Sequence, residues 1–157
     1  MESMKIIIEH PGYKSLVIVL PDDYQKPHLP GLKEWVEALR SGNYKQGAGF
    51  LCKDGKYCCL GVLCHIQGRL IANKECVIPH VLWDQKDQIA HVNASFLSDE
   101  NPLFPFFGSN GKIPHAVKVY KGKDENPLRI IGSLAGLNDE GYNFQTIAEA
   151  IEHIWKE

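Results

Sequence analysis

A nine-residue stretch from Tyr57 to His65, with the sequence Tyr-Cys-Cys-Leu-Gly-Val-Leu-Cys-His, constrains the fold of this chain more than any other feature. It holds three of the five cysteines and is apolar at almost every position. A helix that is apolar all round belongs in the centre of a protein. We therefore predict a buried helix over residues 57–67, ended by Gly68. Gly61 inside this helix costs about 1 kcal/mol relative to alanine, which the close packing of another backbone would explain.

The cysteines of this helix are poorly arranged for binding a metal ion. Zinc requires ligands that converge on one point, whereas Cys59 and Cys64 project about 140° apart around a helix axis. Cys58 and His65 share a face but lie roughly 10 Å apart along the axis. We therefore predict no metal site and no cofactor, and we interpret the cysteines as small buried hydrophobic residues.

A reactive cysteine is the alternative interpretation of the same stretch. Cys58 and Cys59 lie near the predicted N-terminus of the helix, where the pKa of a thiol is lowered, and His80 or His115 would act as the base. Nothing in the sequence ties either histidine to the cysteines, and no carboxylate pair suits general acid–base chemistry. We assign no catalytic residue, and this alternative stays open.

Length and charge restrict the class of protein. The 157 residues suffice for one domain with a hydrophobic core, and 17 basic against 19 acidic side chains give a net charge of −2. Binding of duplex nucleic acid requires a basic face, and a membrane span requires roughly 18 apolar residues in a row; the sequence indicates neither. An odd number of cysteines argues against a disulfide framework, so we expect a cytoplasmic protein.

The remaining elements predict a compact α+β domain over residues 1–157. Residues 4–20 read as a hairpin with a turn at 10–13. Apolar residues recur at helical spacing over 31–41 and over 143–156, where Asn143 is the expected N-cap. Together with the buried cysteine helix, these are about three main helices. We expect them to pack around the cysteine helix, with short strands to one side. Strands are expected at 50–52, 69–72, 76–78, 117–120 and 128–131, and a helix end with a polar turn at 134–141.

The loop between the first two predicted helices is the candidate binding site. Residues 42–49 contain three glycines, a tyrosine, a lysine and a glutamine. Glycines let backbone N–H groups approach a phosphate, a lysine adds charge, and an aromatic ring can stack on a base. The loop lacks the Gly-Lys-Ser/Thr sequence of a Walker loop, and a purely structural turn is the alternative. The predicted ligand-binding residues are Tyr44, Lys45, Gln46, Gly47 and Gly49.

Three segments carry a resemblance when taken together. They are Trp-Val-Glu-Ala-Leu-Arg-Ser-Gly-Asn-Tyr-Lys-Gln at 35–46, Tyr-Cys-Cys-Leu-Gly-Val-Leu-Cys at 57–64, and Leu-Asn-Asp-Glu-Gly-Tyr-Asn-Phe-Gln-Thr-Ile-Ala-Glu-Ala-Ile-Glu at 137–152. The combination, about a quarter of the chain, resembles a family of small uncharacterised proteins common in bacteriophage and prophage genomes. The resemblance implies a phage-type origin and the cytoplasm of a host cell, and it implies no activity.

These observations favour a non-enzymatic phage accessory protein that binds a small nucleotide-like ligand or a host protein. A role in countering host antiviral defence is implied by the resemblance alone. The alternatives are a thiol- or histidine-dependent enzyme acting on a nucleotide or small metabolite, and a structural or assembly role. A binding protein should have a pocket lined by the loop; an enzyme should place a cysteine or histidine within hydrogen-bond reach of a second polar group in that pocket.

Overall fold

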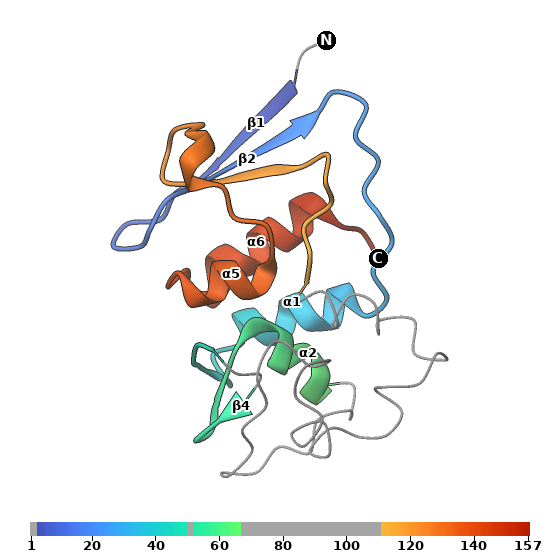
Figure 1. Cartoon of the computed structure of the whole chain (residues 1–157). Coiled ribbons are helices and arrows are strands. Elements are labelled where there is room, and N and C mark those ends of the chain that lie inside the picture. Colours follow the sequence, from blue (N-terminus) through green and yellow to red (C-terminus); the bar gives the residue numbers. More distant parts are fainter. Residues whose placement is uncertain (1–2, 50–51, 67–110) are drawn as a thin grey trace, which may run out of the picture.

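The fold consists of stacked layers of sheet and helix. The computed structural model describes residues 3–49, 52–66 and 111–157. These residues form two small sheets and four α-helices, which confirms the predicted compact α+β class. Figure 1 shows the larger sheet at the top, the two C-terminal helices beneath it, and the remaining helices and the smaller sheet below. None of the helices in the described part of the chain is long and apolar enough to cross a membrane.

The larger sheet is built on the predicted hairpin. Strand β1 (Ser3–Ile8) pairs antiparallel with β2 (Leu16–Pro21), and β2 pairs antiparallel with β6 (Lys118–Lys121). Gly12 in the connecting turn has a φ of 83°, a left-handed conformation that favours glycine. The central strand β2 is buried along most of its length, which explains why its sequence is continuously apolar.

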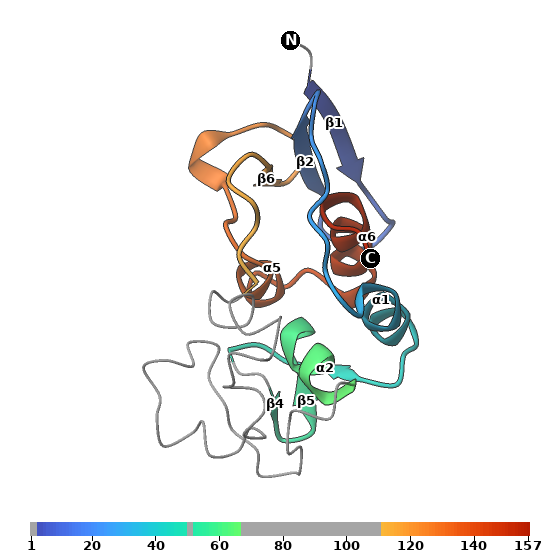
Figure 2. The ribbon, with the colours of Figure 1, turned by 90° about the vertical axis from the view of Figure 1, so that its right-hand side faces the viewer.

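The helices connect this sheet to the cysteine-rich segment. Helix α6 (Phe144–Ile154) packs between strand β1 and helix α1 (Leu32–Arg40), and α1 also contacts α2 (Cys59–Ile66). Helix α5 (Leu134–Asp139) contacts both α2 and α6. Figure 2 shows α1, α5 and α6 lying between the larger sheet and α2. Helix α6 begins after Asn143, whose side chain accepts a backbone N–H of the first turn, as predicted.

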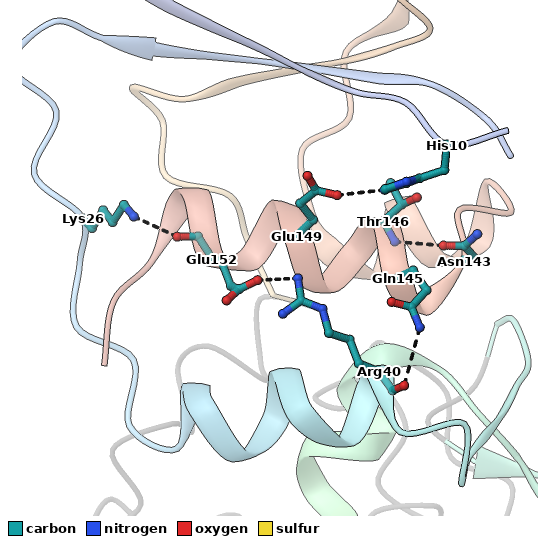
Figure 3. A network of polar contacts seen from close by, with 8 residues as sticks. All are labelled: His10, Lys26, Arg40, Asn143, Gln145, Thr146, Glu149 and Glu152. Carbon is teal, nitrogen blue, oxygen red and sulfur yellow. Dashed lines mark hydrogen bonds and ion pairs between the residues drawn. The ribbon is translucent and has the colours of Figure 1, made fainter.

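Polar contacts hold the sides of α6 to the neighbouring elements (Figure 3). Glu149 lies 2.8 Å from the His10 ring nitrogen in the β1–β2 connection, and Glu152 forms a 2.5 Å ion pair with Arg40 of α1. The Lys26 ammonium donates to the backbone carbonyl of Glu152 at 2.8 Å. These side chains are partly exposed, so each ion pair contributes about 0–1 kcal/mol. They fix the orientation of α6, whereas its stability comes from its buried face.

Two predicted elements near the C-terminus need correction. The strand expected at 128–131 is wrong, because Pro127–Arg129 form a 3₁₀ turn, η2. The Asn126 side chain accepts the Leu128 N–H at 3.0 Å, which fixes this turn locally, and Ile130 makes a single bridge to β6. The helix end expected at 134–141 is a complete short helix, α5, because the Ser133 hydroxyl accepts an N–H of its first turn. The strands expected at 69–72 and 76–78 lie outside the described residues.

The buried face of α6 supports a prediction about stability. Ile151 is fully buried among the layers, so Ile151→Ala should lower the free energy of unfolding by about 2–5 kcal/mol through lost contacts and a cavity. Glu149→Ala on the partly exposed side should lower it by at most about 1 kcal/mol. Urea denaturation of both variants measures the difference, and equal losses would contradict the assigned face.

Candidate functional site

The predicted binding loop is part of a small three-stranded sheet. Strand β3 (Lys45–Gln46) pairs in parallel with β5 (Lys56–Tyr57), and β5 pairs antiparallel with β4 (Cys52–Lys53). Asp54 and Gly55 join β4 to β5 with φ values of 53° and 77°. Two successive left-handed residues are typical of a tight hairpin turn. The strand expected at 50–52 is therefore β4, whose described part begins at Cys52.

Three lysines project from one face of this small sheet. Lys45 is the register partner of Lys56, and Lys56 is the register partner of Lys53. Partners in neighbouring strands point to the same side of a sheet, so the three side chains form a row. All three residues are exposed. The opposite face carries Gln46, Tyr57 and Cys52.

The side chain of Gln46 is occupied inside the protein. Its amide nitrogen donates to the Asn138 side-chain oxygen at 2.9 Å and to the Tyr142 backbone oxygen at 2.7 Å. Both acceptors belong to the segment that ends α5 and leads into α6. Gln46 therefore ties β3 to the α5–α6 turn.

The two glycines predicted to bind a phosphate donate hydrogen bonds within the protein. The Gly47 N–H donates to the Tyr57 backbone oxygen at 2.8 Å, and the Gly49 N–H donates to the Asp139 carboxylate at 2.8 Å. Gly47 also passes so close to β5 that an added Cβ would lie 2.8 Å from the Cβ of Lys56. Packing therefore requires glycine at position 47. The N–H groups of Gly47 and Gly49 already have acceptors within the protein, so they are not available to a phosphate.

Tyr44 faces helix α2. Its hydroxyl lies 2.7 Å from the His65 Nδ1, and its ring meets the Tyr57 ring edge-on with 5.1 Å between the ring centroids. Burial raises the pKa of the Tyr44 hydroxyl, which favours its neutral form. The His65 ring is thus paired with a polar group, as the enzyme alternative requires, but neither Tyr44 nor His65 lines the hollow beside the lysine row.

A hollow of about 340 Å³ lies beside the lysine row. It includes two of the five predicted ligand-binding residues, Gln46 and Gly47. The other three, Tyr44, Lys45 and Gly49, do not line it, although Lys45 is the register partner of the lining residue Lys56. Sequence reasoning missed the contribution of the β4–β5 hairpin, because register across two-residue strands leaves no periodic signal. The lining residues are Gln46, Gly47, Ala48, Lys53, Asp54 and Lys56.

Asn138 holds these elements in place. Its side-chain oxygen accepts the Cys59 backbone N–H at 3.2 Å, in addition to Gln46, and its side-chain nitrogen donates to the Gly47 backbone oxygen at 2.6 Å. The residue is only 2% exposed. The Trp35 indole donates to the Cys59 backbone oxygen at 2.8 Å, which attaches α1 to the same point.

The cysteine-rich segment forms part of the core, as predicted, although helix α2 begins at Cys59 because Tyr57 belongs to β5. Cys58, Cys59 and Cys64 are each 0% exposed. Burial raises the pKa of the Cys58 thiol to about 12 and that of Cys59 well above its usual range. Neither thiol forms the thiolate that a nucleophile needs at neutral pH. His80, one of the two bases considered for a thiol enzyme, lies outside the described residues.

Comparison with known proteins places the chain in a family. A family model described as a domain of unknown function, DUF8296, matches residues 31–155, and the chain belongs to this family. The matched region spans all the segments that surround Asn138. No curated protein and no solved structure matches the chain. The expected phage origin stays a prediction.

Asn138→Ala tests the role of the buried amide. The substitution leaves the Cys59 N–H and the Gly47 carbonyl without their partner, so we expect a loss of about 2–4 kcal/mol in the free energy of unfolding. Asp139→Asn is the control: it changes the exposed neighbouring residue, keeps an acceptor for Gly49, and should cost less than about 1 kcal/mol. A small effect of Asn138→Ala in urea denaturation would exclude a central role for this residue.

The cysteine core gives a second prediction. In the native protein at pH 8, a bulky aromatic disulfide reagent should label Cys58, Cys59 and Cys64 far more slowly than in the unfolded chain, as measured by peptide mass mapping. The stability that comes from keeping Cys58 protonated should be complete below its ordinary pKa of 9.0 and be lost as the pH rises through about 12. Rapid native labelling of these three residues would contradict their burial.

Proposed function

We propose that this protein is a non-enzymatic binding protein for a small, phosphate-bearing, nucleotide-like ligand. The observation that carries the proposal is the row of Lys45, Lys56 and Lys53 across the small sheet, beside a hollow of about 340 Å³. The site combines the predicted loop with the β4–β5 hairpin. Lys45, Gln46 and Gly47 keep a role in it, whereas Tyr44 and Gly49 do not line the hollow.

The lysine row favours an anionic ligand on electrostatic grounds. Like charges directly opposite each other on neighbouring strands destabilise a sheet. A phosphate placed between the ammonium groups would convert this repulsion into charge-assisted hydrogen bonds, for which lysine acts as a point charge. A bound anion would therefore be attracted by several cations at once.

Asp54 favours a ligand with more than a phosphate. Its carboxylate stands at the tip of the hairpin and lines the hollow together with Lys53 and Lys56. A carboxylate repels a bare phosphate but accepts hydrogen bonds from hydroxyl or amino groups. A nucleotide carries such groups on its sugar or base. The positive charge on the lysine side and the negative charge of Asp54 are therefore the reason for proposing a nucleotide-like ligand.

A binding role fits the groups around the site better than catalysis does. The buried thiols of Cys58 and Cys59 remain protonated, and the pair formed by Tyr44 and His65 does not line the hollow. The resemblance to phage proteins further supports an accessory role in the cytoplasm of a host cell. There, we propose, the protein counters host antiviral defence by holding such a ligand; a host protein is the alternative partner.

The lysine row can be tested with ATP and inorganic pyrophosphate as probes. The double variant Lys45→Gln/Lys56→Gln should weaken ATP binding at this site at least about tenfold, because two charge-assisted contacts are lost. Isothermal titration calorimetry measures the affinity, and backbone amide shifts of Gly47 and Ala48 locate it. Lys33→Gln, which removes a positive charge from the exposed side of α1, should leave it unchanged. Absence of ATP-dependent shifts at Gly47 and Ala48 in the unmodified protein would refute the proposal.

A further inference from the structure

A second hollow, of about 370 Å³, lies against the α5–α6 turn. It is formed where four distant segments meet: the start of β2, the end of β6, the η2 turn, and the turn between α5 and α6. From this geometry we propose a second anion-binding site, which takes the phosphate group of a small molecule. Its lining residues are Lys14, Ser15, Lys121, Gly122, Lys123, Arg129, Glu140 and Tyr142.

The charge of this lining is strongly positive. Four of the lining side chains are basic and one, Glu140, is acidic, in a chain whose net charge is −2. Lys123 is held by an ion pair with Glu9, outside the hollow. Lys14, Lys121 and Arg129 are therefore the cations that face a single carboxylate. Such a concentration of like charge attracts anions.

Glu140 is the internal counter-ion. Its carboxylate lies 2.7 Å from the Lys121 ammonium, and the Lys14 ammonium donates to its backbone oxygen at 2.5 Å. The hydrogen bond from Lys121, followed by the charges of Lys121, Lys14 and Arg129, lowers the pKa of Glu140. Three cations thus face one carboxylate, which leaves a net positive charge in the lining.

Arg129 provides the group best suited to a phosphate. Its side chain forms no ion pair with any residue in the described ranges, and the η2 turn that carries it is exposed. A guanidinium presents paired N–H donors that match two oxygens of a phosphate. A phosphate bound by Arg129 and Lys121 would compete with the Glu140 carboxylate for Lys121.

The base of the hollow is rigid. The Tyr142 hydroxyl donates to the Ser15 backbone oxygen at 2.9 Å, and the Gly122 N–H donates to the same oxygen at 3.0 Å. The Lys14 ammonium lies 5.9 Å from the centroid of the Tyr142 ring. Because Tyr142 is buried, these contacts fix the ends of β2 and β6 against the α5–α6 turn. The backbone that carries the cations is therefore held in place by these hydrogen bonds.

The test uses the full chain carrying Lys45→Gln/Lys56→Gln, so that the lysine row does not contribute. Inorganic pyrophosphate is titrated and the backbone amide shifts of Gly122 and Arg129 are followed by NMR. We expect saturable shifts at both residues. Arg129→Gln should weaken binding at least about fivefold through the lost guanidinium contact. Glu140→Gln should strengthen it about threefold, because the competing charge is removed. Lys33→Gln should change neither the amide shifts nor the affinity for pyrophosphate.

Two results would overturn the proposal: pyrophosphate produces no saturable shifts at Gly122 and Arg129, or Glu140→Gln weakens binding. Comparison with ATP identifies the source of the phosphate. Tighter binding of ATP than of pyrophosphate at Gly122 supports a nucleotide, and equal or weaker binding supports a smaller phosphate compound. Shifts confined to Gly47 and Ala48 in the unmodified protein would support the lysine row alone and refute this second site.

Discussion

The structure depends on one buried amide, the side chain of Asn138. Its oxygen accepts hydrogen bonds from the Gln46 side chain and the Cys59 backbone, and its nitrogen donates to the Gly47 backbone. A buried amide with these three bonds has little remaining cost of desolvation. It also connects the small sheet, the start of α2 and the end of α5. Without this residue, three segments distant in the sequence would each lose a fixed partner.

The same α5–α6 turn contacts the loop beside the first hollow and lines the second. Asp139 receives the Gly49 N–H on one side, while Glu140 accepts from Lys14 and Lys121 on the other. The Tyr142 backbone oxygen accepts a hydrogen bond from the Gln46 amide, and the Tyr142 hydroxyl donates to Ser15 at the base of the second hollow. A displacement of this turn would therefore alter both hollows. The segment 137–152, which carried part of the phage resemblance, owes its pattern to these contacts as well as to the buried face of α6.

The fold was largely predictable from sequence because its main elements have a local signal. The hairpin, α1, the cysteine helix and α6 each show a period or an apolar run that is sufficient to identify them. The apolar content of residues 128–131 predicts a strand, whereas Asn126 and Pro127 impose a local turn. The sequence predicts only a helix end where α5 lies, because six residues give less than two turns of periodicity.

The candidate site was predicted only in part, for a physical reason. The sequence located the loop and its lysine, but the use of Gly47, Gly49 and Gln46 depends on partners about 90 residues away. The row formed with Lys53 and Lys56 depends on the pairing of two-residue strands. Both are long-range properties, which have no sequence period. The sequence predicts a polar turn that includes Asn138, and only the fold shows that this residue is buried.

The distribution of charge also bears on the kind of ligand that we propose for such a surface. The two basic hollows are local features of a chain whose net charge is −2, and acidic residues such as Glu149 and Glu152 lie along α6. At physiological ionic strength, charges are screened over about 8 Å, so a ligand senses the few cations it contacts rather than the whole molecule. Duplex nucleic acid gains affinity from many phosphates along a continuous basic face. A small anion needs only the two or three cations of one hollow, and its binding should weaken with salt far less steeply.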